Sequence, residues 1–245
     1  MFLSIDIGNT NITLGIFDGE KLVSNFRLPS KEDFDLSLLK DFQIDSCAIA
    51  SVVDGLGEAM KTACDKAFGI DSFLFDTKFS PIKIGLKNPD EVGADRIANA
   101  YAAYCNYKLP AIVVDLGTAT TFDIVSSNGV FLGGVIMPGL NLQLKSLYSN
   151  TSKLPKIEAS EAERAIGDST KNAILSGVIR GSAGAIEGLI HQCELELGEK
   201  ATVVATGGYS GLISKYMFRR FDDINPNLTL EGLKKLYEFS HVNLY

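Results

Sequence analysis

Two short segments of this chain combine residue types that could hold phosphate groups and a metal ion. The first is Asp6-Ile-Gly-Asn-Thr-Asn-Ile-Thr-Leu-Gly15, and the second is Asp115-Leu-Gly-Thr-Ala-Thr-Thr-Phe-Asp-Ile124. In each segment an acid can bind a cation, while glycine lets phosphate oxygens approach the backbone N–H groups. Thr and Asn add hydrogen-bond donors without adding bulk. Two such turns facing each other would hold the phosphate tail of a nucleotide.

The repetition of this segment is more informative than either copy. An Asp-x-Gly-x-Thr segment on its own is usually a hairpin turn whose Asp caps its own backbone. Here each copy follows a short apolar run and precedes a β-rich run that ends in a turn signal, Asp18-Gly19 or Ser127-Asn128-Gly129. Both copies therefore predict strand, tight turn, strand, turn and strand. Matching contexts in the two halves favour the functional interpretation over the simple turn.

Asp95 and Arg96 form a second candidate pair, directly after Gly93-Ala94 at the start of a predicted helix. Considered alone, the pair is an acid placed favourably near a helix N-terminus. Beside a phosphate site, the carboxylate could accept the proton of an attacking hydroxyl, and the guanidinium could bind an anionic acceptor. Phosphoryl transfer requires mainly positioning and charge neutralisation, so such a base need not be strong.

The elements that must position these residues are predicted from hydrophobic periodicity. The first half predicts a meander ending near Leu28, strands over 47–53 and 72–75, and helices over 36–42, 57–68 and 94–107. The second half predicts a meander over 111–137, helices over 140–149 and 169–197, and a strand over 201–206 before Gly207-Gly208. In the long helix, Gly177, Gly181 and Gly184 predict close backbone approach, because glycine is a poor helix former.

Repeated sheet and helix units predict an α/β protein made of two similar domains with a cleft between them. We place the domains at 1–109 and 110–245, with a soft boundary because no linker separates the halves. There is no Gly-x-x-x-x-Gly-Lys-Ser/Thr loop, and no Gly-x-Gly-x-x-Gly opens a Rossmann unit. A bound nucleotide would therefore be held by hairpins rather than by a helix N-terminus.

Composition narrows the range of partners and compartments. The net charge is −7 and no basic run exceeds Arg219-Arg220, which argues against nucleic acid as the main partner. Four cysteines without a Cys-x-x-Cys pair suggest neither a zinc site nor a disulfide framework, and free thiols fit a reducing cytoplasm. No basic region precedes the N-terminal apolar run, and we predict no stretch of membrane-spanning length. We therefore expect a cytoplasmic protein that does not bind a membrane.

Taken together, the motifs resemble those of the type III pantothenate kinase family, in order and spacing, over nearly the whole chain. The segments that carry the resemblance are Asp6-Ile-Gly-Asn-Thr10, Asn88-Pro-Asp-Glu-Val92, Gly93-Ala-Asp-Arg96, the segment from Asp115 to Asp123, Gly133-Gly-Val-Ile-Met-Pro-Gly139, Gly167-Asp-Ser-Thr170, Ala205-Thr-Gly-Gly208 and Leu228-Thr-Leu-Glu-Gly232. The resemblance implies a duplicated fold of the actin-like ATPase and sugar-kinase superfamily. It also implies ATP-dependent phosphorylation of pantothenate to 4′-phosphopantothenate, the first step towards coenzyme A.

The resemblance further implies roles for individual residues. Asp95 would accept the proton of the pantothenate hydroxyl, Mg²⁺ would lie near Asp6, and a monovalent cation, K⁺ or NH₄⁺, would lie at Asp115. The residues that would bind ATP are Asp6, Gly8, Asn9, Thr10, Asn11, Thr13, Gly117 and Thr118. The residues that would line the pantothenate site are Gly93, Ala94, Asp95, Arg96 and Thr170. Members of the family are homodimers, and residues 133–139 would belong to the dimer interface.

Leu86 departs from the family pattern. Many members have a tyrosine seven residues before the first glycine of the Gly-x-Asp-Arg motif, and this chain has Leu86 there. Leucine cannot supply a phenolic hydrogen bond, so we expect this substrate-site position to affect pantothenate affinity but not the chemical step.

Two alternatives to this function remain. One is a kinase of the same fold with another acceptor, and Gly93-Ala-Asp-Arg96 argues against it. The other is a non-catalytic regulator, because some relatives of the family were first described as transcriptional accessory factors. The presence of both Asp6 and Asp95 argues against that second alternative.

Overall fold

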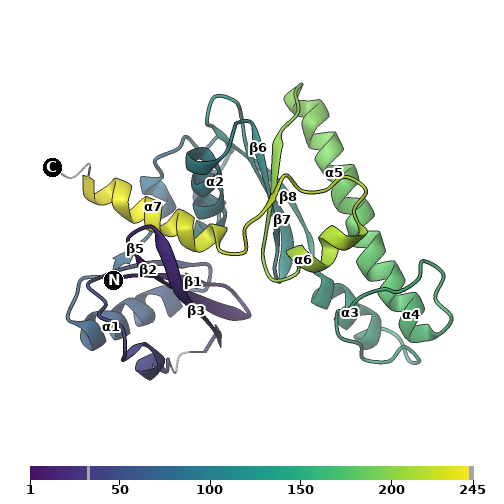
Figure 1. Cartoon of the computed structure of the whole chain (residues 1–245), viewed down its shortest axis with the longest axis horizontal. Coiled ribbons are helices and arrows are strands. Elements are labelled where there is room, and N and C mark those ends of the chain that lie inside the picture. The colour runs from purple at the N-terminus through teal and green to yellow at the C-terminus, as the bar shows by residue number, and fades with distance from the viewer. Residues whose placement is uncertain (32–33, 243–245) are drawn as a thin grey trace. The chain divides into compact units, whose positions relative to one another are not determined.

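The computed structural model describes residues 1–31 and 34–242, which form two compact units (Figure 1). Unit 1 comprises Met1–Asn106 together with the C-terminal segment that begins at Asn227, and unit 2 comprises Tyr107–Pro226. Each unit contains one five-stranded sheet. The N-terminal segment of unit 1 thus ends three residues before the predicted boundary at 109. Unit 1 also contains the last helix, which the sequence placed in the second domain.

Unit 1 is built on a mixed sheet with the strand order β3-β2-β1-β4-β5. The strands are β1 (Phe2–Ile7), β2 (Asn11–Asp18), β3 (Lys21–Pro29), β4 (Ser46–Ser51) and β5 (Phe73–Leu74). Strands β1 to β3 form the predicted antiparallel meander, while β4 runs parallel to β1 and β5 runs parallel to β4. The carboxyl ends of β1 and β4 therefore lie side by side at one edge of the sheet.

Helices cover both faces of this sheet. They are α1 (Leu56–Phe68), α2 (Ala94–Asn106) and α7 (Leu228–Val242). Alternate residues of β1, such as Ile5 and Ile7, share an apolar cluster with Met60 of α1. The other residues of β1 face the opposite way. The Ser4 hydroxyl shows this, since it donates a hydrogen bond to the Leu230 carbonyl of α7 at 2.7 Å. Side chains of β1 thus alternate between α1 and α7, as the period of a strand requires.

Unit 2 repeats this arrangement with the strand order β10-β9-β6-β7-β8. The strands are β6 (Ala111–Leu116), β7 (Ala119–Val125), β8 (Phe131–Pro138), β9 (Thr202–Thr206) and β10 (Asp223–Ile224). In the two registers, Asp6 lies opposite Thr13 and Asp115 lies opposite Thr121. In each unit the central strand begins an antiparallel meander of three strands on one side and pairs with a parallel strand on the other. The duplication inferred from the two turns is confirmed.

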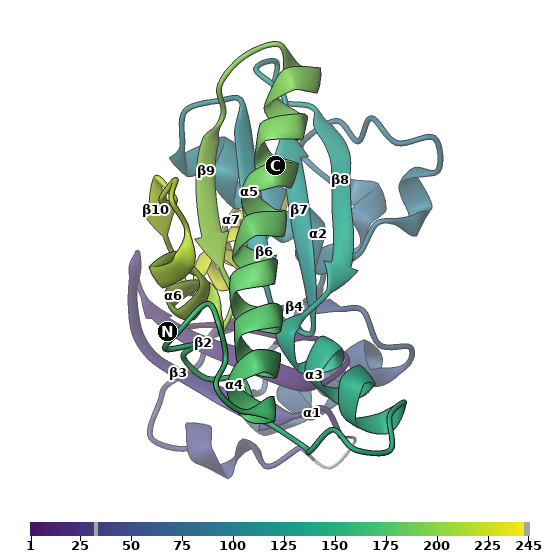
Figure 2. The same ribbon diagram turned by 90° about the vertical axis from the view of Figure 1, so that its right-hand side faces the viewer.

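A long helical stretch lies along the sheet of unit 2 (green in Figure 2). The helical segments of this unit are α3 (Leu140–Ser149), α4 (Thr170–Leu175), a π-helical turn (Ser176–Arg180), α5 (Gly181–Leu197) and α6 (Ser210–Ile213). Side chains of the stretch, including Ile179, Ile186 and Ile190, pack in the core with Ile112 and Val114 of β6. The predicted helix over 169–197 is therefore present, with a π-helical turn that the sequence analysis did not anticipate.

Three expectations about helices need correction. The helix predicted over 36–42 is a short 3₁₀ turn, Leu36–Leu39; the other 3₁₀ turns are Thr77–Phe79, Pro89–Glu91 and Ser214–Tyr216. The glycines of the long stretch do not mark close backbone approach, because a Cβ added at Gly177, Gly181 or Gly184 would meet no described atom within 4 Å. The stretch Thr170–Leu197 is also long and apolar enough to span a membrane, with a mean hydropathy of 1.3, although we predicted no such stretch.

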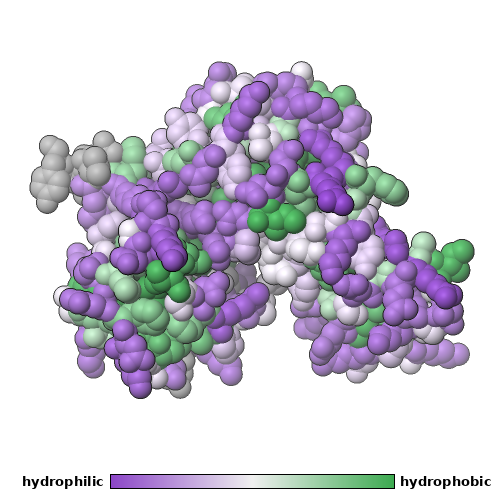
Figure 3. All heavy atoms as spheres, viewed as in Figure 1, coloured by the Kyte–Doolittle hydropathy of each residue, from purple (hydrophilic) through white to green (hydrophobic). Residues whose placement is uncertain are grey.

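The apolarity of that stretch has a structural explanation in unit 2. Of the apolar window, 44% is buried inside the protein, where Val178, Ala183 and Ile186 form part of the core. A core helix meets the same criteria of length and composition as a membrane span. On the face seen in Figure 3, hydrophilic residues cover much of the surface of each unit, and smaller hydrophobic patches lie among these residues.

Glu194, near the end of α5, is a buried carboxylate held by three donors. Arg219 Nη1 and Lys200 Nζ each lie 2.8 Å from its Oε2, and the Ala201 N–H donates to Oε1 at 3.2 Å. Burial by itself raises the pKa of Glu194, but the hydrogen bonds from Arg219 and Lys200 outweigh it and lower this pKa to about 2. A carboxylate with a depressed pKa contributes stability above its unfolded pKa, and this contribution is lost as the pH falls.

We expect Glu194→Gln to lower the free energy of unfolding by about 3 kcal/mol at neutral pH, because the pKa of Glu194 is lowered from 4.5 to about 2. The difference from wild type should shrink as the pH falls from about 4.5 to about 2. Urea unfolding over this pH range measures both effects. Glu196→Gln, an exposed change on the same helix, is the matched control and should cost less than about 0.5 kcal/mol. Equal stability of the two variants would contradict the prediction.

Candidate functional site

The first predicted phosphate-binding turn lies between β1 and β2 in unit 1. The Gly8 N–H donates to the Asn11 carbonyl at 3.0 Å, which closes the turn. The Ser30 hydroxyl donates to the Gly8 carbonyl at 2.5 Å, and the Ser30 N–H donates to the Thr10 carbonyl at 3.2 Å. Ser30, which directly follows β3, therefore binds two carbonyl groups of the turn. The sequence analysis missed it, because a lone serine after a strand carries no motif.

Asp6 precedes this turn as the penultimate residue of β1. Its side chain is half-buried, and it follows Ser4 on the face of the sheet that α7 covers. Asn9 and Thr10, at the tip of the turn, are exposed. The turn thus places a carboxylate at the edge of the sheet and exposed amide and hydroxyl side chains at its tip.

Asp95 lies in the first turn of α2, where the Gly93 carbonyl accepts hydrogen bonds from the N–H groups of Arg96 and Ile97 at 3.2 and 3.3 Å. The Asp95 Oδ1 accepts a hydrogen bond from the Arg96 N–H at 2.7 Å. A Cβ at position 93 would lie 2.5 Å from this oxygen, so only glycine leaves room for the carboxylate in this orientation. The glycine of the Gly-Ala-Asp-Arg motif is thus explained by contact with its own aspartate.

The pKa of Asp95 is raised above its ordinary value. Burial of the carboxylate is the main cause, and the Arg96 N–H and the positive charge of Arg96 oppose it only in part. A carboxylate that is costly to keep ionised is a better proton acceptor than an exposed aspartate. The raised pKa therefore suits Asp95 to the role of a general base.

Strand β4 connects the first turn with the start of α2. Ile7 lies opposite Ser51 in the parallel register, and the Val52 N–H donates to the Ile7 carbonyl at 3.1 Å. The Val52 side chain lies 3.2 Å from the position of a Cβ at Gly93. The Asp6 turn and the Gly93-Ala-Asp-Arg96 segment therefore meet at the same edge of the sheet, as their proposed roles require. Leu86 is half-buried in the loop that precedes this segment.

The second turn, in unit 2, lies against two glycines from outside it, Gly139 and Gly207. The Gly117 N–H closes the turn by donating to the Ala119 carbonyl at 3.0 Å, and the Gly139 N–H donates to the Thr118 carbonyl at 3.2 Å. Gly207, after β9, has a φ of +84°, and a Cβ there would lie 2.5 Å from Asp115 Oδ1. The Asp115 carboxylate thus lies in a space that a side chain at position 207 would fill. The roles of Gly139 and Gly207 depend on tertiary contacts.

Thr170 lies outside both turns. It is the exposed first residue of α4, where the hydroxyl of the preceding Ser169 caps the helix by accepting a hydrogen bond from the Asn172 N–H at 3.2 Å. The capping function that a hydroxyl at this place could serve is therefore performed by Ser169. The Thr170 hydroxyl is left exposed at the helix N-terminus.

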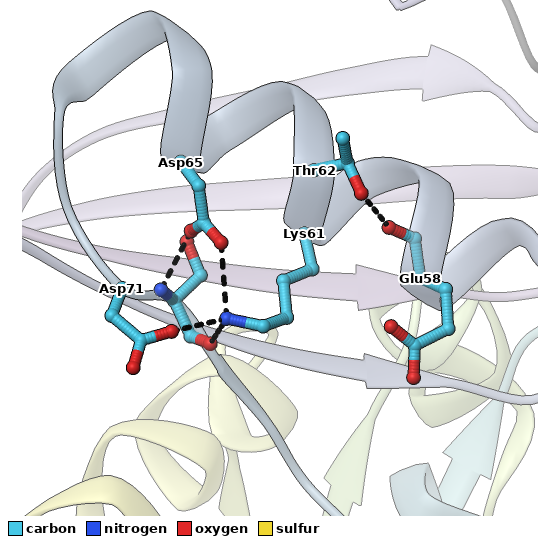
Figure 4. Close-up of polar contacts among 6 residues, drawn as sticks. Glu58, Lys61, Thr62, Asp65 and Asp71 are labelled. Atoms are coloured by element: carbon cyan, nitrogen blue, oxygen red, sulfur yellow. Dashed lines mark hydrogen bonds and ion pairs between the residues drawn. The ribbon is translucent and has the colours of Figure 1, made fainter.

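A pocket of about 960 Å³ adjoins the start of α2 in unit 1 and includes Gly93 and Ala94 in its lining. Its lining includes the acidic residues Asp54, Glu58, Asp71, Asp76, Asp90 and Glu91. Lys61 also lines it, but its ammonium group is bonded to Asp65 at 3.0 Å and Asp71 at 2.5 Å (Figure 4). An acidic lining does not favour an anionic substrate, so the carboxylate of an acceptor would be bound outside this pocket.

The carboxylates of the two turns fit cation sites whose remaining ligands come from a bound substrate and water. Within residues 1–31 and 34–242, no three His, Cys, Asp or Glu side chains gather to hold a metal ion. Mg²⁺ commonly binds one or two carboxylates together with phosphate oxygens and water. Asp6 fits such a site, and the confined carboxylate of Asp115 supplies the oxygen donors that a hard monovalent cation prefers.

Comparisons with known proteins give a consistent result. The model of the type III pantothenate kinase family matches residues 2–192. A type III pantothenate kinase of Dehalococcoides mccartyi (strain CBDB1) is 41% identical over 254 aligned positions, which cover 98% of this chain and 96% of that protein. The corresponding enzyme of Moorella thermoacetica is 40% identical and covers 97% of this chain and 99% of that protein.

Solved structures share the fold at lower identity. A Campylobacter jejuni protein named for the Baf family of transcriptional activators has a TM-score of 0.65 at 23% identity, covering 98% of this chain and 99% of that one. MreB5 of Spiroplasma citri bound to ADP has a TM-score of 0.57 at 14% identity, covering 99% and 98% of the two chains. At these identities the similarity concerns the fold alone.

Proposed function

This chain belongs to the type III pantothenate kinase family, and we propose that its first turn and the N-terminus of α2 carry the reacting groups. It phosphorylates pantothenate with ATP as the phosphoryl donor, in the pathway to coenzyme A. Its fold is the duplicated α/β fold of actin-like ATPases and sugar kinases. The observation that carries the assignment of the site is the meeting of the Asp6 turn and Asp95 at one edge of the unit 1 sheet.

Asp95 acts as the general base in this proposal. Its partly desolvated carboxylate accepts the proton of the pantothenate hydroxyl as that oxygen attacks the terminal phosphate of ATP. Arg96, next in the helix, binds the anionic acceptor. Gly93 and Ala94 complete this part of the pantothenate site, with Leu86 in the preceding loop and Thr170 at the start of α4. The exposed hydroxyl of Thr170 supports its assignment.

The two turns bind the phosphates of ATP. In unit 1 the assigned residues are Asp6, Gly8, Asn9, Thr10, Asn11 and Thr13, and in unit 2 they are Gly117 and Thr118. Asp6 would hold Mg²⁺, which when bound neutralises phosphate charge. Asp115 would hold a monovalent cation. The space that Gly207 leaves for the Asp115 carboxylate supports this assignment.

We further propose that the protein is a cytoplasmic homodimer that binds neither nucleic acid nor membranes. The edge strand β8 supports dimerisation, because its Leu132 and Ile136 are exposed at 46% and 67%. The net charge of −7 speaks against a polyanionic partner.

The experiment that tests the proposed function is a coupled ADP-release assay with ATP, Mg²⁺ and pantothenate, in K⁺ and again in Na⁺. We expect turnover that depends on pantothenate and is faster in K⁺. Asp115→Asn should reduce the K⁺ advantage, because the variant lacks the charge assigned to the cation. If K⁺ accelerated turnover equally in the variant and in wild type, Asp115 would be excluded from the cation site.

Two outcomes would favour the alternatives. ADP release without pantothenate dependence would indicate another acceptor on the same fold. No turnover in either salt would favour the non-catalytic regulator. The similarity to the Campylobacter jejuni protein does not support that regulator, because it shows the fold alone.

A further inference from the structure

Residues 150–169 form neither helix nor strand, and they lead directly to Thr170 at the start of α4. Irregular segments of this length are uncommon within compact domains and often serve a function. Although much of this segment is exposed, Ala162 is only 3% exposed. The segment is therefore fixed to unit 2 at a defined point.

Arg180 and Tyr216 hold the two sides of the Ala162 residue. The Ala162 N–H donates to the Tyr216 hydroxyl oxygen at 2.7 Å, and Arg180 Nη2 donates to the Ala162 carbonyl at 2.9 Å. The guanidinium carbon of Arg180 lies 4.9 Å from the centre of the Tyr216 ring, within the range of a cation–π contact. Two side chains from different elements thus bind one residue and also contact each other. We call Arg180 and Tyr216 the clamp.

Further contacts lead from the clamp back to the start of α4. The Ser176 hydroxyl donates to the Ala165 carbonyl at 2.6 Å. A Cβ at Gly167 would lie 2.2 Å from the Ala173 nitrogen, so the segment touches the helix backbone there. Nearer still to Thr170, Asn172 Nδ2 donates to Asp168 Oδ1 at 2.6 Å. Residues 162–169 therefore follow the helix backwards, from Arg180 to its first turn.

The π-helical turn coincides with the donors that bind this segment. Ser176 and Arg180 are its first and last residues, and both donate hydrogen bonds to the carbonyls of residues 162–165. Single π-helical turns inside α-helices are rare and occur frequently at functional sites. The altered helix geometry lies where the segment is attached, which links the π turn to the placement of the segment.

We propose that Arg180 and Tyr216 are positioning residues for pantothenate binding, which they affect by fixing residues 162–169 and thereby the place of the Thr170 hydroxyl. This inference rests on the proposed role of Thr170 in the substrate site. The clamp contains no group assigned to the reacting atoms or to the phosphates of ATP. Its loss therefore weakens pantothenate binding and leaves the phosphoryl-transfer step unchanged.

The test measures kcat and both KM values for Arg180→Met and Tyr216→Phe. Arg180→Met keeps most of the side-chain length but removes the donors, and Tyr216→Phe removes a single hydroxyl. We expect the KM for pantothenate to rise about 5- to 20-fold, with kcat and the KM for ATP within about twofold of wild type. Arg220→Met and Tyr148→Phe, both at exposed positions of unit 2, are the matched controls and should leave all three constants unchanged.

A double-mutant cycle with Thr170→Val decides whether the clamp acts through Thr170. If it does, Thr170→Val raises the KM for pantothenate in the wild-type background and adds little in the Arg180→Met background. Fully additive effects would overturn the proposal, as would a fall in kcat with an unchanged KM. Since Arg180→Met can fail to fold, Tyr216→Phe serves as the second background.

Hydrogen exchange gives a readout that does not depend on activity. Both clamp variants should show at least threefold faster amide exchange in residues 162–170 than wild type, with unchanged exchange in β6 and β7. Unchanged exchange in residues 162–170 would overturn the clamp. Absence of pantothenate-dependent turnover in the wild-type enzyme would instead refute the proposed function, so the two failures are distinguishable.

Discussion

Asp95→Asn lowers kcat by about 10²- to 10⁴-fold, the range that a positioned general base contributes. The asparagine oxygen can still accept the hydrogen bond from the Arg96 N–H, which is 2.7 Å long in the wild type, so the start of α2 keeps its geometry. The amide cannot accept the proton of the pantothenate hydroxyl. ATP binding stays within about twofold, because the phosphates are assigned to the two turns. Steady-state kinetics and ATP titration measure the two effects.

The pH profile gives an independent check of the same role. Burial raises the pKa of Asp95, so the wild-type kcat/KM should fall as the pH drops through a value above that of an ordinary aspartate. The Asp95→Asn variant lacks the titrating carboxyl and should lose this acidic limb. Asp41→Asn, which removes an exposed carboxylate from the same unit, is the matched control and should retain it. Full turnover in Asp95→Asn would exclude the residue from the mechanism.

Gly232→Ala destabilises unit 1 by about 3 kcal/mol, at the upper end of the range for overpacking. Gly232 lies where α7 crosses α2, and a Cβ there would be 2.0 Å from the Ala98 carbonyl oxygen and 3.1 Å from the Ala102 Cβ. The contact is with backbone, so no rotamer change can relieve it and the two helices must move apart. Moving the helices apart would also disrupt the hydrogen bond that the Thr229 hydroxyl donates to Asn99 Oδ1 at 2.8 Å. Urea unfolding followed by circular dichroism measures the loss.

Gly188→Ala is the matched control for this substitution. Gly188 lies in the interior of α5, and a Cβ there would meet no described atom within 4 Å. Alanine should therefore raise stability by about 0.5–1 kcal/mol, because it lowers the entropy cost of forming the helix. If both variants gained stability, the close crossing of α2 and α7 would be refuted.

The repeated turns show how much of the fold could be predicted from local pattern. Apolar runs followed by Asp-x-Gly-x-Thr predicted two meanders, and the strands β1 to β3 and β6 to β8 confirm them. The start of α2 was predicted at Ala94, where it begins, because a helical apolar period follows Gly93 directly. Family-specific motifs identified the reaction as well, since they span nearly the whole chain. These features depend on residues close together in sequence, where steric and periodic rules are strong.

What only the tertiary structure decided involves residues far apart in the chain. The placement of α7 on unit 1 requires Gly232 to meet Ala98, a contact that no local pattern encodes. The raised pKa of Asp95 depends on its burial. The first turn is supported by Ser30, whose hydroxyl donates to the Gly8 carbonyl from 22 positions away. The clamp at Ala162 needs a π-helical turn and a tyrosine 54 positions away. The packing and the desolvation of a side chain depend on many such distant neighbours. A sequence by itself shows the residues without showing which of them are in contact.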